Sequence, residues 1–208
     1  MKPLRPLLSV VLALVLVLLL VPALPTPLYG APPETCGVWR WGVKTLSDAN
    51  ADDVDFEPQA TTVGTLRALD PPRLRSNTPR IRPTEYRTYR IRARVLHDKW
   101  VCCREKDDGD YHLVLADPRN RRGTLIAEIS DPECPGARDS AKVSALHRVR
   151  RDYDNLVRTP PKGRFRTFQD PPLLFVTGVG FFDEVHGQKG VAPNGIELHP
   201  VLDVKSAP

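Results

Sequence analysis

The chain lacks the short motifs that mark most common enzyme and nucleotide-binding classes. Its 208 residues contain no nucleophile elbow, P-loop, Rossmann glycine pattern or helical zinc motif. The four cysteines include no C-x-x-C pair, which argues against a cysteine-based metal site. The sequence therefore favours a protein that is not an enzyme and needs no cofactor, with a divalent metal such as zinc as the alternative.

The one long hydrophobic run is too short for a membrane span. Residues 7–21 are almost all apolar and follow two cations, Lys2 and Arg5. A spanning helix needs about 20 apolar residues, whereas a secretory signal needs fewer and begins with positive charge. We predict that residues 1–30 are a signal peptide, with an uncleaved N-terminal anchor as the alternative. The mature chain is then secreted, periplasmic or attached to the cell envelope, without a transmembrane domain; the oligomeric state stays open.

Cysteines in an exported chain predict disulfides. Cys36 and Cys134 each lie beside Gly or Pro in apparent loops, and we predict a bridge between them. Cys102 and Cys103 are adjacent, so their side chains diverge in a strand and a bridge between them would be strained.

Residues 31–83 are rich in proline and show little periodicity, which predicts an irregular arm packed on the rest of the chain. One short helix is expected within residues 61–69. Trp39-Arg40-Trp41 is expected to dock on the domain as an apolar plug, or alternatively to offer a stacking surface for a ligand.

Periodicity sharpens within residues 84–208. Alternating apolar residues predict strands over 86–95, 111–117, 124–130, 173–182 and 196–204, and a three- to four-residue repeat predicts a helix over 140–157. A helix between the third and fourth of five strands matches the OB-fold, a small Greek-key β-barrel. We predict a mainly β, five-stranded OB-like barrel; an open α+β sheet is the alternative.

Several segments together resemble a family of exported bacterial proteins of uncharacterised function. The resemblance rests on the segments 110–117 (DYHLVLAD), 126–134, 176–183 and 186–201 (HGQKGVAPNGIELHPV), and extends upstream to 43–45 and 61–63. It implies a single OB-like domain and carries no established activity. The adjacent pair Cys102-Cys103 departs from that family's pattern.

Two groups of residues are candidates for function. Arg90, Arg92 and Arg94 alternate with apolar residues, so they are expected to form a row on the outer face of the first strand, with Glu128 as one charge partner. OB-folds bind oligonucleotides and oligosaccharides through such faces and the flanking loops. A solvated, charge-paired surface is the alternative.

The second group is Asp183, His186, Glu197 and His199, which flank a glycine-rich turn near the C-terminus. If the fourth and fifth strands pair through this turn, a carboxylate and two imidazoles could hold zinc or manganese and activate water. The alternative is a hydrogen-bonded loop without a ligand.

These patterns support three functions. The first is a binding module that recognises a polyanion, nucleic acid or cell-wall glycan through the barrel loops and the arginine row. The second is a metal-dependent, phosphodiesterase-like hydrolase that uses the four C-terminal residues, and the third is a structural envelope protein. The formal net charge of +5, which falls to +3 without Lys2 and Arg5, is too small to decide for nucleic acid.

Overall fold

A computed structural model describes residues 36, 37, 39–102 and 107–208. The predicted signal peptide over residues 1–30 and Cys103 of the adjacent cysteine pair lie outside these residues. Within the described part of the chain, no helix is both long enough and apolar enough to cross a membrane.

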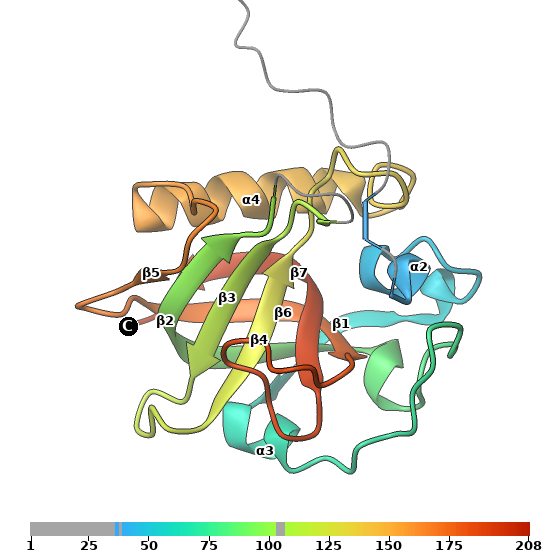
Figure 1. The fold of residues 1–208 in the computed structure, drawn as a ribbon, viewed down its shortest axis with the longest axis horizontal. Coiled ribbons are helices and arrows are strands. Elements are labelled where there is room, and N and C mark those ends of the chain that lie inside the picture. Colours follow the sequence, from blue (N-terminus) through green and yellow to red (C-terminus); the bar gives the residue numbers. More distant parts are fainter. Residues whose placement is uncertain (1–35, 38, 103–106) are drawn as a thin grey trace, which may run out of the picture. The chain divides into compact units, whose positions relative to one another are not determined.

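Five strands close into the predicted OB-like barrel (Figure 1). They are β2 (Arg87–Trp100), β3 (Tyr111–Ala116), β4 (Thr124–Ile129), β6 (Leu173–Phe182) and β7 (Ile196–Ser206). The order around the barrel is β2-β3-β4-β7-β6, and pairing of β6 with β2 closes it. Only the contact between β4 and β7 is parallel among these neighbours. The fold prediction is confirmed, and the open-sheet alternative is wrong.

Strand β2 is long because it serves two neighbours. Its first half, Thr88 to Arg94, pairs with β6, and its second half, Arg94 to Trp100, pairs with β3. An irregularity between Val95 and His97 bends the strand where it passes from one neighbour to the other.

Apolar side chains at alternate positions along each strand point inward and fill the barrel interior. Helix α4 (Val143–Val157) lies across one end and adds Val149 and Tyr153 to this core (Figure 1). It begins three residues later than predicted, because residues 140–142 form a turn in which Ser140 Oγ accepts from Lys142 N. Helix α3 (Val63–Arg67) lies toward the opposite end and buries Leu66 in the same core.

The arm is more regular than the sequence indicates. It contains α2 (Trp41–Thr45), a 3-10 turn at Ala51–Asp53, strand β1 (Asp55–Thr61) and α3, and a second 3-10 turn at Thr84–Tyr86 follows it. Strand β1 pairs in parallel with β2, and a two-residue strand, β5 (Arg166–Thr167), pairs elsewhere on β2. β1 was missed because none of its side chains is buried and Pro58 interrupts it, as an edge strand allows.

A buried ion pair holds the arm to the barrel. The guanidinium of Arg40 donates to both carboxylate oxygens of Glu85, at 2.8 and 2.5 Å, and both side chains are fully buried. Glu85 Oε1 also accepts from the backbone N–H of Phe182 at the end of β6. The segment Trp39-Arg40-Trp41 therefore docks as predicted, but its anchor is a charge pair rather than an apolar plug.

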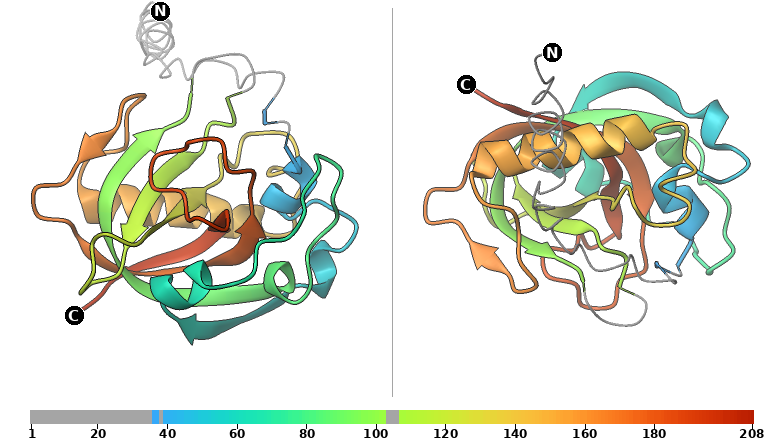
Figure 2. Two further views of the ribbon diagram at one scale, coloured as in Figure 1. Left: turned by 60° about the horizontal axis from the view of Figure 1, so that its bottom comes forward. Right: turned by 90° about the horizontal axis from the view of Figure 1, so that it is seen from above.

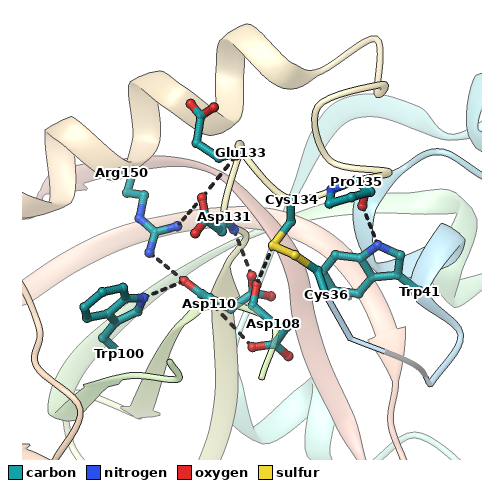
Figure 3. The surroundings of a disulfide bond; sticks show 11 residues. Cys36, Trp41, Trp100, Asp108, Asp110, Asp131, Glu133, Cys134, Pro135 and Arg150 are labelled. Atoms are coloured by element: carbon teal, nitrogen blue, oxygen red, sulfur yellow. Dashed lines mark hydrogen bonds and ion pairs between the residues drawn. A yellow bond between two sulfur atoms is a disulfide. The ribbon is translucent and has the colours of Figure 1, made fainter. Parts of the chain in front are cut away.

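The predicted disulfide between Cys36 and Cys134 is present, with 5.8 Å between the Cα atoms. It ties the start of the arm to the segment before α4 (Figure 3). Close by, the indole N–H of Trp41 donates to the carbonyl of Pro135 at 2.6 Å. The sulfur of Cys134 lies 3.2 Å from the carbonyl oxygen of Asp108, so the bridge is in contact with the loop between β2 and β3.

Replacing both cysteines, in Cys36→Ser/Cys134→Ser, should lower the free energy of unfolding by about 2–4 kcal/mol. The bridge joins residues 98 apart, and its loss frees a long loop in the unfolded chain. Urea unfolding of the oxidised parent and the double variant measures the difference. Adding reductant should destabilise the parent by more than it destabilises the double variant.

Candidate functional site

A row of polar side chains crosses the outer wall of the barrel. His112 on β3, Glu128 on β4 and His199 on β7 occupy the strand positions that alternate with core residues, so they point away from the interior. His112 and Glu128 are directly paired in register. His112 Nδ1 lies 3.0 Å from Glu128 Oε1, and His199 Nδ1 lies 3.0 Å from Glu128 Oε2. One carboxylate therefore bridges two imidazoles.

The arm and the loops cover this row, so that an outward-facing set of charges is buried. His112 is 7% exposed, Glu128 7% and His199 0%. The carbonyl of Lys189, in the loop between β6 and β7, accepts from His112 Nε2 at 2.9 Å. Burial makes each of these contacts stronger than it would be in water.

The loop between β2 and β3 closes the other side of His199. Asp110 Oδ2 lies 3.1 Å from His199 Nε2, and Ser130 Oγ lies 3.2 Å from the same nitrogen. The second oxygen of Asp110 accepts from the backbone N–H of Asp131 at 2.8 Å (Figure 3). The neighbouring carbonyl of Gly109 accepts from Arg150 on α4 and from the indole of Trp100. Together with the bond from Asp131, these contacts hold the loop in place.

Lys44 brings a positive charge from α2 into the same region. Its ammonium lies 3.3 Å from Asp183 Oδ2 and 5.4 Å from the ring centroid of Phe181. Glu197 is 1% exposed and is directly paired in register with Phe181. The carboxylates of Glu128, Asp183 and Glu197 all act electrostatically on Lys44. Lys44 therefore links Asp183 and Glu197 to the group formed by His112, Glu128 and His199.

A cavity of about 150 Å³ opens beside this buried cluster. The loop between β2 and β3 contributes Asp108, and the loop between β6 and β7 contributes Asp183, Glu184 and His186. The arm contributes Gly37, Trp39, Trp41 and Lys44. In the OB-fold these two loops, which join the first strand to the second and the fourth to the fifth, flank the usual ligand site.

The pKa values of the groups in this cluster are shifted in different directions. Burial alone would lower the pKa of His199, but contact with Asp110 and Glu128 outweighs it and raises the pKa to about 10. Burial favours the neutral form of Glu128, yet His112 and His199 hold its pKa well below the usual range. His199 and Glu128 therefore form a charged pair.

The remaining carboxyl groups are pushed toward their neutral forms. Burial, with repulsion from Asp110 and Glu128, raises the pKa of Asp108 to about 8. Burial also raises the pKa of Asp110, against the opposing pull of His199, and burial with repulsion from Glu128 raises that of Glu197 well above normal. For Lys44 the surrounding carboxylates outweigh burial and raise the pKa. The cluster therefore contains more acidic groups than basic groups.

Three buried polar atoms of the cluster have no hydrogen-bond partner among the described residues. They are Asp110 Oδ2, His199 Nδ1 and Glu197 Oε2. The short distances from His199 to Asp110 and Glu128 are therefore ion-pair contacts without directed hydrogen bonds. One ligand atom from each of Asp110, Glu128 and His199 can be chosen so that all lie within 4.8 Å of one another.

The structure divides the four residues predicted from the C-terminal motif. His199 and Glu197 lie in the buried cluster, and Asp183 joins it through Lys44. His186 is exposed, and its backbone N–H donates to the side chain of Gln188. Among the described residues, the close group of possible metal ligands includes His199 and does not include Asp183, His186 or Glu197.

The arginine row lies on the outer face of β2, as its alternation predicted. Arg90 and Arg92 are exposed and Arg94 is half-buried. Arg92 donates to the carbonyl of Pro208 and Arg94 to that of Pro171 at 2.9 Å. Glu128 is not their partner, because it lies on the wall of β4 between His112 and His199.

Sequence reasoning missed Lys44, Asp108, Asp110, His112 and Glu128 as members of one cluster. The aspartates lie in an Asp-Gly turn, which a hairpin needs for conformational reasons alone. The hairpin register contained a usable signal, since pairing of β3 with β4 sets His112 opposite Glu128. Lys44 carries no such signal, because only the folding of the arm onto the barrel brings it there.

Comparison with known proteins gives no relative from which a role could be transferred: no protein-family model, curated protein or solved structure matches the chain. The site is therefore interpreted from its own geometry.

Proposed function

We propose that this protein is an exported binding module that takes one unit of a glycan into the cavity between the arm and the barrel loops. The observation that carries the proposal is the composition of the cavity, in which the side chains of Trp39 and Trp41 share one small space with Asp108 and Asp183. Indole rings offer an apolar face to a sugar ring, and carboxylates accept hydrogen bonds from sugar hydroxyls.

The size of the cavity supports a small ligand unit. Its volume of about 150 Å³ is below the roughly 300–1,000 Å³ of sites for drug-sized molecules. A single ring at the end of a chain, or one ring of a longer chain, fits this limit. The indole nitrogen of Trp39 is a buried donor with no hydrogen-bond partner among the described residues.

The charges of the cavity favour a neutral or amino sugar over a polyanion. Two carboxylates line it, from Asp183 and Glu184, and the carboxyl group of Asp108 is mostly neutral because its pKa is raised to about 8; Lys44 and His186 are the basic residues of the lining. The ammonium of Lys44 is already paired with Asp183. A sulfated or phosphorylated chain would meet net repulsion there.

Calorimetric titration with two probes tests the proposal: oligomers of N-acetylglucosamine, which are neutral, and oligomers of glucosamine, which carry amines. We expect binding of at least one probe by the parent and a loss of at least tenfold in affinity in Trp39→Ala. Trp39→Phe keeps an aromatic face and should retain part of the affinity. Tyr86→Ala, an aromatic substitution outside the cavity near the start of β2, is the matched control and should bind as the parent does.

Binding of neither probe by the folded parent would contradict the proposal, as would equal losses in Trp39→Ala and Tyr86→Ala. The second result would show that the loss of affinity is not specific to the cavity.

The arginine row is tested separately with heparin. Because Arg92 and Arg94 donate to backbone carbonyls, we expect the parent to bind heparin weakly at low salt. Arg90→Ala/Arg92→Ala should change stability by less than about 0.5 kcal/mol, since both side chains are exposed. A strong interaction with a steep salt dependence that the double variant abolishes would instead favour a polyanion-binding face.

A further inference from the structure

We propose that Asp110, Glu128 and His199 form a site for one divalent transition-metal ion of the zinc or manganese class, buried beneath the arm. The site differs from the one predicted from the sequence, because only His199 is common to both. It is independent of glycan binding in the cavity, since none of its three residues lines that cavity.

The first support is the ligand set. The three residues come from a loop and two adjacent strands, and their ligand atoms lie within 4.8 Å of one another. Zinc–oxygen and zinc–nitrogen bonds are about 2.0–2.2 Å long, so ligand atoms around one ion lie roughly 3–4 Å apart. Small side-chain rotations would bring the three atoms to that spacing. One imidazole with two carboxylates suits zinc or manganese.

The second support is the unmet bonding capacity of the ligand atoms. Asp110 Oδ2 and His199 Nδ1 belong to fully buried side chains and have no hydrogen-bond partner among the described residues. Buried polar atoms are almost always hydrogen-bonded. These two atoms have only ion-pair contacts, Asp110 Oδ2 with His199 Nε2 at 3.1 Å and His199 Nδ1 with Glu128 Oε2 at 3.0 Å, and bonds to an ion would supply the directed contacts that they lack.

The third support is the charge of the surroundings. Five carboxyl groups act on one another here, from Asp108, Asp110, Glu128, Asp183 and Glu197. Three basic groups face them, from Lys44, His112 and His199. The carboxyl groups outnumber the basic groups, and a cation bound among them would offset this excess.

The ligands are also held from outside. Glu128 accepts from His112 through the oxygen that does not face His199, and Asp110 accepts from the backbone N–H of Asp131. Such contacts orient metal ligands and are expected to matter for affinity.

Metal analysis of the full exported chain tests the proposal. The protein is stripped with a chelator, dialysed against Zn²⁺ or Mn²⁺, and its bound metal is measured by mass spectrometry. We expect one ion per chain in the parent and a loss of at least tenfold in affinity in Glu128→Gln and Asp110→Asn. The matched control is Glu197→Gln, which changes a buried carboxyl on the same wall that lies outside the ligand set, and it should keep one ion.

X-ray absorption of the loaded parent keeps the proposal testable even if the ligand variants fail to fold. One imidazole nitrogen with two carboxylate oxygens is the expected set. The proposal is overturned by a parent that binds no stoichiometric ion, by a spectrum with two or more imidazoles, or by ligand variants that fold and keep the ion.

Discussion

Removing the charge of Glu85 should destabilise the protein more than any other single charge change outside the cluster. In Glu85→Gln the guanidinium of Arg40 stays fully buried but loses its counter-ion, and breaking such a buried pair costs about 3–5 kcal/mol. The substitution also weakens the acceptors for the backbone N–H groups of Ile81 and Phe182. Urea unfolding measures the loss.

Two comparisons separate this effect from a general one. Arg40→Met/Glu85→Gln should cost clearly less than the two single substitutions added together, because the double variant leaves no unpaired charge. Asp53→Asn breaks the ion pair between Asp53 and Arg82, whose side chains are 60% and 69% exposed, and should cost at most about 0.5 kcal/mol. A Glu85→Gln variant as stable as Asp53→Asn would show that the arm is not anchored by this pair.

The second large effect is a loss of stability with rising pH in protein kept free of metal by a chelator. The pKa of His199 is raised from 6.5 to about 10, so its contribution is complete below about pH 6.5 and is lost as pH rises through about 10. A shift of this size corresponds to an upper bound on the order of 3–5 kcal/mol. His199→Gln should be less stable than the parent at pH 6 and should lose less stability than the parent between pH 7 and 10.

Asp108 contributes with the same sign. Its pKa is raised from 3.8 to about 8, so the fold holds a proton that the unfolded chain releases, and stability falls as pH rises between these values. Asp108→Asn should therefore match the parent near pH 4 and exceed its stability near pH 9. A parent whose free energy of unfolding is constant between pH 6 and 10 would contradict the charge distribution described for the cluster.

The barrel was predictable because each core strand carries its own periodic signal. The ranges predicted for β3, β4 and β6 differ from the observed ones by at most one residue at either end. β1 carries no such signal, since an edge strand paired through its backbone does not need an alternating apolar face. The disulfide was predicted because Cys36 and Cys134 each lie beside Gly or Pro in apparent loops, whereas Cys102 and Cys103 are adjacent.

The site was only partly predictable, because most of its residues are far apart in the sequence and meet only in the folded chain. Glu197 and His199 lie on one face of β7, and this much follows from the sequence because alternation along a strand is a local property. Their partners Glu128, Asp110 and Lys44 come from three other parts of the fold, and their meeting depends on barrel closure and on docking of the arm. His186 was grouped with them by sequence spacing alone, whereas the loop holds it exposed.

The most direct test of the proposed function is a crystal structure of the mature chain with an oligomer of N-acetylglucosamine or glucosamine. The account predicts one sugar ring in the cavity lined by Trp39 and Trp41, with hydroxyl groups in hydrogen-bond contact with Asp108 or Asp183. A sugar bound over Arg90 and Arg92 on β2, or a cavity that holds only water at saturating ligand, would contradict it.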